Sequence, residues 1–340
     1  MPPRLYCDMT SQRILSVSSR EFDPSDYERL VQILNANYPD YAVSVAEQRS
    51  RDESIDKSKY VYQRLTFSDE ETGRIVGFGG VSHVLDMFHP RRYMISIYVD
   101  PNEQGRGVGS AIYQRLSSQL EALGAEVVWA SNKEDYPRQR QFFQKRGFRE
   151  KSRAWESRLV LATFDPSHFQ PYIAKVSREG ISFTTLAHEK EKGESFLRPL
   201  YELVQLIQAD MPREAAFTPL SYEQWKSLSI DSPRLIPEGY VIAKHDSTLV
   251  GMSNVLRNEK EPRNLSQDDT GVIRDYRGRG IAMALKLNVI EFARKNGYDS
   301  IKTWNDSTNS PMLAVNSKLG FKRKVGWILM ERPLIRNGTP

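Results

Sequence analysis

The chain has 340 residues, of which 39% are hydrophobic and 27% are charged, and its formal net charge is +5. This length suits two domains of about 150 to 170 residues, each large enough to bury a core. The weak, diffuse positive charge suits an anionic ligand and does not predict nucleic-acid binding. No apolar run is long enough to span a membrane, and residues 1–4 lack a signal-peptide core. We therefore expect a cytoplasmic globular protein without a membrane or nucleic-acid partner.

The first part of the chain predicts alternating helices and strands. Asp23-Pro24-Ser25-Asp26 carries the residue types that cap a helix, and residues 68–73 form an acidic, glycine-containing turn. The elements expected here are a strand near residues 13–18, a helix over 27–37, a helical stretch over 43–52 on the substrate side, and a hairpin of 61–67 with 74–85.

A strand over residues 95–99 ends in a glycine-rich turn that opens a helix. Ile95, Ile97 and Val99 alternate with other residues, as in a half-buried strand, and helical spacing resumes at Ala111. In such a turn the backbone N–H groups converge on the positive end of the helix dipole and can hold phosphate oxygens. Glycine allows a ligand to approach the backbone closely. The sequence therefore predicts a phosphate-binding turn.

Two common phosphate-binding loops are excluded by the spacing of this turn. The chain lacks GxxxxGK[ST], and Gly105-x-Gly107-x-Gly109 is not the GxGxxG dinucleotide fingerprint. The turn reads Gln104-Gly105-Arg106-Gly107-Val108-Gly109, which matches the pattern Gln/Arg-x-x-Gly-x-Gly/Ala.

The remaining elements follow the same order twice. Asp165-Pro166-Ser167 interrupts the pattern between the two series. The first series is expected to continue with a helix to residue 123, a strand to 130, a helix to 146 and closing strands to 161. A connecting helix is expected over 168–179, and the second series over 181–331, with a helix near 196–208 and a polar loop at 257–264.

A constant offset shows that the chain is a tandem duplication. Arg277-Gly278-Arg279-Gly280-Ile281-Ala282 repeats the glycine turn 173 residues later. Asn132 after one strand is matched by Asn305, and Gly147-Phe148 is matched by Gly320-Phe321, at the same offset. Independent landmarks that keep one offset are the mark of an internal repeat.

Each copy resembles the GNAT superfamily of acyl-CoA-dependent N-acyltransferases. The glycine turn matches the pyrophosphate-binding signature of that family. The run from Thr303 through Asn309, Met312 and Asn316 to Phe321 is similar to the C-terminal half of mycothiol-synthase-like tandem GNATs. The resemblance implies an α/β (α+β) protein of two tandem GNAT folds, each a mixed, mostly antiparallel sheet flanked by helices. We expect GNAT domains over residues 1–164 and 181–340, joined by a linker helix over 165–180.

The resemblance also implies an acetyl-CoA site in each copy. In GNATs the backbone of the strand before the turn pairs with the pantetheine arm, and the turn holds the pyrophosphate. The cofactor-binding residues implied in the first copy are Ile97, Tyr98, Val99, Gln104, Gly105, Arg106, Gly107, Val108, Gly109, Ser110 and Asn132. Those implied in the second copy are Thr270, Gly271, Val272, Arg277, Gly278, Arg279, Gly280, Ile281, Ala282, Asn305 and Asn309.

The position of the catalytic acid departs from the family. Many GNATs place a tyrosine four residues before the Gly-Phe pair, where this chain has Phe143 and Asn316. Phe143 has no proton to donate, whereas Asn316 can donate a hydrogen bond to a departing thiolate. Asp268 and Asp269 are candidate bases for the incoming amine, with a solvated loop end as the alternative. We therefore expect the C-terminal copy to carry turnover.

Other reactive side chains have structural alternatives. Cys7 is the single cysteine, so no internal disulfide forms, which fits a reducing cytosol. His83, Asp86 and His89 could be spaced for a metal, but no HExxH pattern or Cys partner accompanies them. Asn309 can be a helix N-cap or a ligand contact. We expect no metal cofactor.

These patterns predict an N-acyltransferase that moves acetyl from acetyl-CoA to a primary amine of a small molecule. Two alternatives stay open: a CoA-binding regulatory protein in which neither copy turns over, and a protein or peptide N-acetyltransferase. Fold and cofactor motif leave the acceptor undefined. Duplication supplies the pairing that single GNAT domains often obtain by dimerising, so a monomer or a homodimer is expected.

Overall fold

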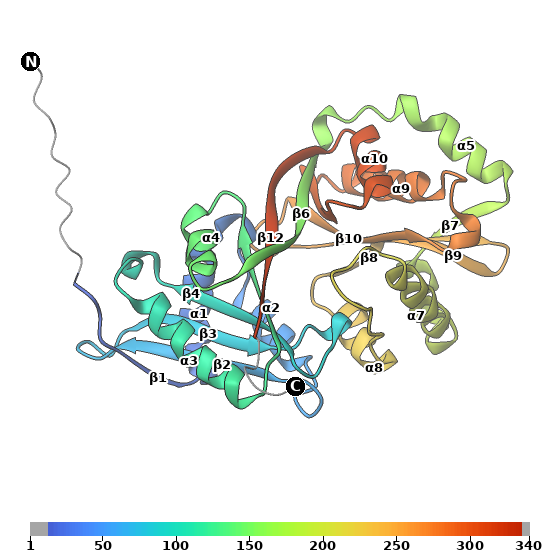
Figure 1. The fold of residues 1–340 in the computed structure, drawn as a ribbon. Helices are drawn as coiled ribbons and strands as arrows, with labels where there is room; N and C mark the ends of the chain where they lie inside the picture. The colour runs from blue at the N-terminus through green and yellow to red at the C-terminus, as the bar shows by residue number, and fades with distance from the viewer. Residues whose placement is uncertain (1–12, 335–340) are drawn as a thin grey trace, which may run out of the picture.

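A continuous sheet runs through the described part of the chain, residues 13–334, in the computed structural model (Figure 1). Its twelve strands lie in the order β1-β2-β3-β4-β5-β12-β6-β11-β10-β9-β8-β7. Most neighbours are antiparallel, and the β4–β5 and β10–β11 pairs are parallel. This architecture confirms the predicted mixed, mostly antiparallel sheet flanked by helices. Cys7 lies outside the described residues.

The strands are β1 (Val17–Glu21), β2 (Tyr62–Asp69), β3 (Ile75–Ser82), β4 (Arg92–Val99), β5 (Val127–Lys133), β6 (Arg149–Val160), β7 (Ile181–Thr185), β8 (Leu235–His245), β9 (Thr248–Leu256), β10 (Asn264–Val272), β11 (Ser300–Asp306) and β12 (Lys322–Pro333). The α-helices are α1 (Tyr27–Asn37), α2 (Val45–Glu53), α3 (Val108–Ala122), α4 (Pro137–Gln144), α5 (Gln170–Arg178), α6 (Leu186–Glu189), α7 (Glu194–Ala209), α8 (Tyr222–Trp225), α9 (Ile281–Lys295) and α10 (Ser310–Lys318).

Local sequence signals place most of these elements. Asp23 accepts a hydrogen bond from the Ser25 backbone and caps the turn that leads into α1, as predicted. The strand predicted near residues 13–18 is wrong in position, because β1 spans Val17–Glu21. The segment before β1 instead lies against the first glycine turn, because the Leu15 N–H donates to the Arg106 carbonyl at 3.0 Å.

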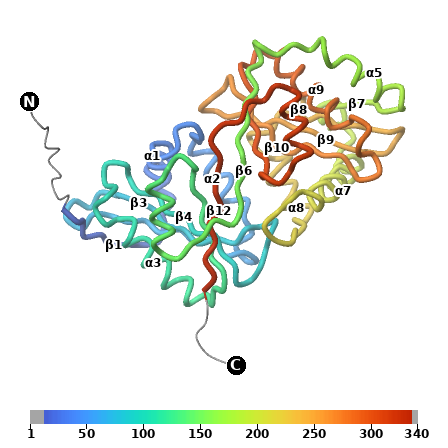
Figure 2. Tube along the Cα trace, turned by 45° about the horizontal axis from the view of Figure 1, so that its top comes forward, coloured from blue at the N-terminus to red at the C-terminus, as the bar shows by residue number. Residues whose placement is uncertain are grey.

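The two halves exchange their last strands. β12, from the end of the chain, pairs with β5 of the first half, and β6 pairs with β11 of the second half. β6 and β12 also pair with each other, so the order β5-β12-β6-β11 is symmetric about their boundary. Figures 1 and 2 show green β6 and red β12 side by side between the two halves.

The exchange carries core side chains across the molecule. Ile328 and Met330 of β12 are fully buried in the core of the first half. Leu159 of β6 and the adjacent Leu161 are buried in the core of the second half. Burying each side chain is worth roughly 1.5–3 kcal/mol. Each half therefore depends on a strand that the other half supplies.

Each half also contains a split between two parallel strands. The β4–β5 register ends at the pair Ile95 and Ala130, although β4 continues to Val99. The β10–β11 register ends at Ser266 and Lys302, and β10 continues to Val272. The ends of β4 and β10 therefore have no neighbouring strand on this side.

None of the helices within residues 13–334 combines the length and apolar character needed to cross a membrane.

Candidate active site

The two glycine turns have the same backbone conformation. Gly107 and Gly280 are left-handed, with φ of 89° and 94°, and each stands directly before its helix, α3 or α9. Gly105 and Gly278 also have positive φ. Only glycine adopts this conformation without strain, and it leaves the first helical N–H groups free to bind an anion. This geometry suits the binding of phosphate oxygens in either half.

Four side chains of the two predicted signatures bind the protein itself: Gln104, Arg106, Arg277 and Arg279. The Gln104 amide donates to Asn37 Oδ1 at 3.0 Å. Arg277 Nη2 donates to Asp210 at 2.7 Å, and its Nε donates to the Val272 carbonyl at 2.9 Å. These side chains brace the turns, which leaves the backbone as the surface offered to a ligand.

Aromatic side chains pack beside the open end of β4 in the first half. The Tyr38 ring stacks on Tyr136 with centroids 5.7 Å apart, and it also contacts Tyr98 and Trp327. Asn37 Nδ2 donates to the Val99 carbonyl at 2.9 Å, so this backbone acceptor is already engaged. The backbone of Tyr98 and Val99 was predicted to hold the pantetheine arm, with the side chains free to pack. In this structure they face other side chains of the same protein.

The second half has smaller side chains at the corresponding positions. At the 173-residue offset, Tyr38, Tyr98 and Tyr136 correspond to Met211, Gly271 and Asn309, and Trp327 corresponds to Ala154. The end of β10 therefore lacks the equivalent of the aromatic cluster.

Asn316 lies beside this second opening and is almost fully buried, with 2% of its surface exposed. Its Nδ2 donates to Asn305 Oδ1 at 2.6 Å, which brings together two residues predicted for the site. Asn316 Oδ1 has no hydrogen-bond partner among the described residues. An unpaired buried acceptor is costly, so it marks a place where a ligand group can bind.

Of the other predicted asparagines, Asn309 has a structural role, and the ligand role predicted for Asn132 stays a prediction. Asn309 Oδ1 accepts from the Met312 backbone at 3.3 Å and caps α10, which is the structural alternative raised for it. Asn132 is fully buried and its Nδ2 donates to the Lys133 carbonyl at 3.0 Å, but its Oδ1, like that of Asn316, has no hydrogen-bond partner among the described residues. Phe143, at the position of Asn316, packs in the core of the first half.

Asp268 and Asp269 form a β-bulge inside β10, rather than the loop end considered from the sequence. On β9 only Asn254 lies opposite them, between the pairs Gln267↔Val255 and Thr270↔Ser253. Asn254 fixes both residues, because its Nδ2 donates to Asp268 at 3.1 Å and its Oδ1 accepts from the Asp269 N–H at 3.0 Å. A bulge turns consecutive side chains toward one face.

The two carboxylates have raised pKa values. Surrounding protein raises the pKa of Asp268, although its side chain is exposed to the cavity, and Asn254 and Arg234 oppose this shift. Burial, and then the neighbouring Asp268 charge, raise the pKa of Asp269 to about 7. The Gln208 amide donates to Asp269 at 2.8 Å. A carboxylate with a pKa near 7 suits general-base catalysis at neutral pH.

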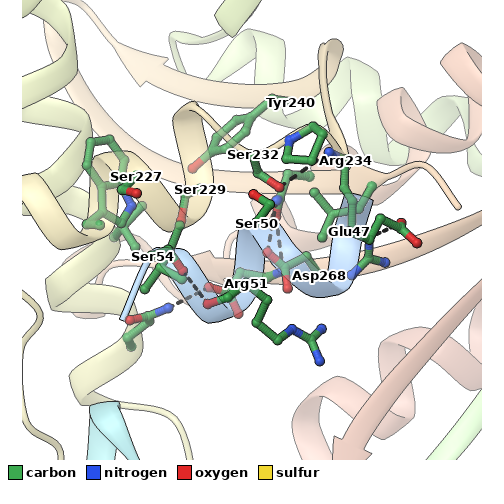
Figure 3. A pocket seen from close by; sticks show the side chains of 18 of the residues that line it. Glu47, Ser50, Arg51, Ser54, Ser227, Ser229, Ser232, Arg234, Tyr240 and Asp268 are labelled. Atoms are coloured by element: carbon green, nitrogen blue, oxygen red, sulfur yellow. Dashed lines mark hydrogen bonds and ion pairs between the residues drawn. The ribbon is translucent and has the colours of Figure 1, made fainter. Parts of the chain in front are cut away.

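A cavity of about 310 Å³ opens in front of this bulge and is lined by both halves of the chain. Figure 3 shows α2 of the first half along one side, bearing Ser50, and Tyr240 and Asp268 on the side of the second half. Arg234 lies 3.6 Å from Glu47 of α2, an ion pair between the halves. The helix predicted over residues 43–52 therefore lines a cavity shared with the other half, and its place on the substrate side stays a prediction.

The cavity residues outside the signature were not identified from the sequence. Glu47, Asn254 and Tyr240 lie far apart in the chain, and only the sheet order brings them together. One sequence signal was available: a single extra residue in β10 relative to β4 changes the offset between the copies and marks the bulge.

Within residues 13–334, no three His, Cys, Asp or Glu side chains gather closely enough to hold a metal ion. His83 Nδ1 instead accepts from the Val61 N–H at 2.9 Å, and Asp86 pairs with Arg213.

Comparisons with known proteins match this architecture. A family model described as "Acetyltransferase (GNAT) family" matches residues 27–148 and again 200–321. A mycothiol acetyltransferase from Frankia casuarinae is 24% identical over 259 residues, which are 73% of this chain and 69% of that protein.

Two solved structures cover nearly the whole chain. A tandem GNAT protein from the clavulanic acid biosynthesis pathway has a TM-score of 0.72 at 17% identity, covering 95% of this chain and 100% of that one. A GCN5-related N-acetyltransferase from Sphaerobacter thermophilus has a TM-score of 0.68 at 18% identity, covering 93% and 95%. These likenesses confirm the tandem fold.

Proposed function

The chain belongs to the acetyltransferase (GNAT) family, and from this premise we propose that its C-terminal half transfers acetyl from acetyl-CoA to a primary amine of a small molecule. The observation that carries the proposal is the contrast between the two strand openings. Tyr38, Tyr98 and Tyr136 pack together beside the end of β4, whereas the bulge of β10 places Asp268 and Asp269 on a cavity. A volume of about 310 Å³ lies at the lower end of small-molecule pockets, roughly 300–1,000 Å³.

The backbone of the second half holds the acetyl donor in this proposal. The N–H groups at the start of α9 bind the pyrophosphate oxygens, and Thr270 and Gly271 offer the unpaired edge of β10 to the pantetheine arm, while the Val272 carbonyl accepts from Arg277. Bound acetyl-CoA supplies the activated thioester. The same turn in the first half retains a phosphate-binding conformation, but aromatic side chains pack beside its strand opening, so we assign that half a structural role.

Asp269 acts as the general base in this proposal. Its carboxylate accepts a proton from the incoming ammonium or amine, directly or through a water, and its pKa near 7 suits that exchange. Asp268 keeps the local charge negative, which attracts a cationic amine into the cavity. Asn254 holds both carboxylates in place through its amide.

Asn316 acts on the leaving group. Asn305 uses one N–H of the Asn316 amide, which leaves the second N–H available to the departing sulfur. Such a hydrogen bond stabilises negative charge as it develops on the sulfur. Solvent then supplies the proton, because asparagine does not ionise.

A matched pair of variants tests the assignment of function to one half. Gly107→Val and Gly280→Val each place a β-branched residue at a φ near +90°, so both impose the same backbone strain. We expect Gly280→Val to lose CoA binding by calorimetry and acetyl transfer to an amine panel. Gly107→Val is expected to keep transfer, provided that its melting curve shows a folded protein.

The opposite pattern would assign catalysis to the first half. Calorimetry that found CoA affinity unchanged in both variants would contradict the cofactor assignment. Tight CoA binding without transfer to any small amine or peptide would identify a regulatory CoA-binding protein, and transfer to peptide N-termini alone would identify a peptide N-acetyltransferase.

A further inference from the structure

Lys286 is buried inside the second half with 1% of its surface exposed, and the proposed reaction does not use it. It points from α9 toward the back of β10, where its ammonium donates to Gln267 Oε1. Its Nζ also lies 5.0 Å from the centroid of the Phe321 ring. A buried ammonium is unfavourable unless it is well bonded, so its presence in the core requires a reason.

Gln267 connects this ammonium to a small polar network. Its Nε2 donates to Ser253 Oγ at 2.7 Å and to Thr270 Oγ1 at 3.2 Å, and the two hydroxyl oxygens lie 2.8 Å apart. Gln267 is the last paired residue of β10 before the bulge, and Thr270 is the first paired residue after it. The network therefore joins the two sides of the bulge that carries Asp268 and Asp269.

The first half shows the same fold without this network. By strand register, Gln267, Thr270 and Ser253 correspond to Ile95, Ile97 and Gly79, and Lys286 corresponds to Tyr113 on α3. Two isoleucines and a glycine thus occupy the strand positions where the second half has polar side chains.

The first half also has a straight strand in place of the bulge. β4 pairs residue for residue with β3, from Gly77↔Val99 to Ser82↔Met94. Bulge and polar network therefore occur together in the second half, and the first half has neither. The fold alone does not require the buried lysine.

We propose that Lys286 is a positioning residue: its ammonium holds the Gln267 amide, and Gln267 fixes the bulge that presents Asp268 and Asp269 to the cavity. This inference rests on the proposed function, because it concerns the carboxylate assigned there as the base. Burial lowers the pKa of Lys286 to about 7, which is the direction expected for an amine enclosed by protein.

The first test removes the ammonium and keeps the length of the side chain. Lys286→Met is expected to lower kcat roughly tenfold to hundredfold, because a small displacement of a reacting group has such an effect. The KM for acetyl-CoA is expected to stay unchanged. Independently of any substrate, the Asp269 N–H is expected to exchange faster with deuterium, since its bond to Asn254 depends on the bulge.

A double variant separates positioning from packing. Lys286→Met leaves Gln267 with an unpaired buried oxygen, which lowers the melting temperature. Lys286→Met combined with Gln267→Ile replaces the pair by apolar side chains, as Ile95 does in the first half, so stability should recover. The loss of kcat and the faster Asp269 exchange should persist. Tyr113→Phe, at the corresponding position of α3, serves as the control and should leave kcat unchanged.

Recovery of kcat together with stability in the double variant would overturn the proposal, because Lys286 would then act only through packing. Wild-type kcat and Asp269 exchange in a folded Lys286→Met protein would also overturn it. If the wild type transfers acetyl to none of the amines tested, the proposed function fails, and the exchange rate of the Asp269 N–H still decides whether Lys286 holds the bulge.

Discussion

Asp269 carries the pH dependence that we expect of the reaction. A base must be deprotonated to accept a proton, and burial with the adjacent Asp268 raises its pKa to about 7. We therefore expect kcat/KM to increase with pH through about 7 in the wild type. Asp269→Asn should lower kcat about 10²-fold to 10⁴-fold and remove this inflection. An inflection that persists in the variant would assign it to another group, such as Asp268.

The same group sets a pH dependence of stability with a definite sign. An unfolded aspartate ionises near pH 4, whereas Asp269 in the native protein ionises near pH 7. The stability that this group contributes therefore falls as pH rises from about 4 to about 7. Asp269→Asn should raise the melting temperature at pH 8, and the difference should shrink at pH 5. A variant less stable than the wild type at pH 8 would contradict this expectation.

Asn316 and Phe143 occupy corresponding positions and should respond differently to truncation. Asn316→Ala removes a hydrogen bond to the departing sulfur, so kcat should fall roughly tenfold to thousandfold, while CoA affinity measured by calorimetry changes little. Phe143→Ala removes a ring from the core of the first half and should cost about 3–5 kcal/mol of stability. Its folded fraction should keep the wild-type kcat. A wild-type kcat in Asn316→Ala would remove Asn316 from the mechanism.

At the level of elements, helix α2 belongs to the first half and lines the cavity of the second. Ser50 on α2 faces that cavity (Figure 3), so Ser50→Trp should fill part of the space and raise the KM for the amine roughly tenfold, equivalent to about 1.4 kcal/mol of binding. The KM for acetyl-CoA should stay constant. Glu53→Trp places the same side chain on an exposed position of the same helix and should change neither constant.

Local signals explain why most elements could be predicted and why parts of the site could not. Capping by Asp23, the glycine turns and the Asn305 and Asn316 landmarks are all encoded within short segments. The bulge at Asp268 is encoded by one extra residue in β10, which becomes visible only when the strand registers are compared. Arg234 and Glu47 meet only because the halves pack against each other.

For the whole molecule, the exchange of β6 and β12 could not be predicted from the sequence. Each copy ends in a strand of similar pattern, and nothing local specifies whether it pairs within its own half. The predicted division at residues 164 and 181 stays a prediction. Because of the strand exchange, neither of the two parts that it defines contains all the strands of its own half of the sheet. A cut in the linker would separate β5 from β12 and β6 from β11.

Separated halves should therefore fail to fold alone and should fold together. A fragment of residues 1–180 retains β6 but loses β11 and β12. The edge of β5 is then unpaired, and the core of the first half lacks Ile328 and Met330. A fragment of residues 181–340 loses the strand that covers β11. Each fragment alone should show no cooperative melting transition, whereas coexpression should yield a one-to-one complex in sedimentation with acetyltransferase activity.

The full chain, cut by a protease within the linker, provides the control because its strands are already paired. A cooperative transition in either isolated fragment would show that its own last strand can pair within that half, and the exchanged arrangement would not then be required for folding.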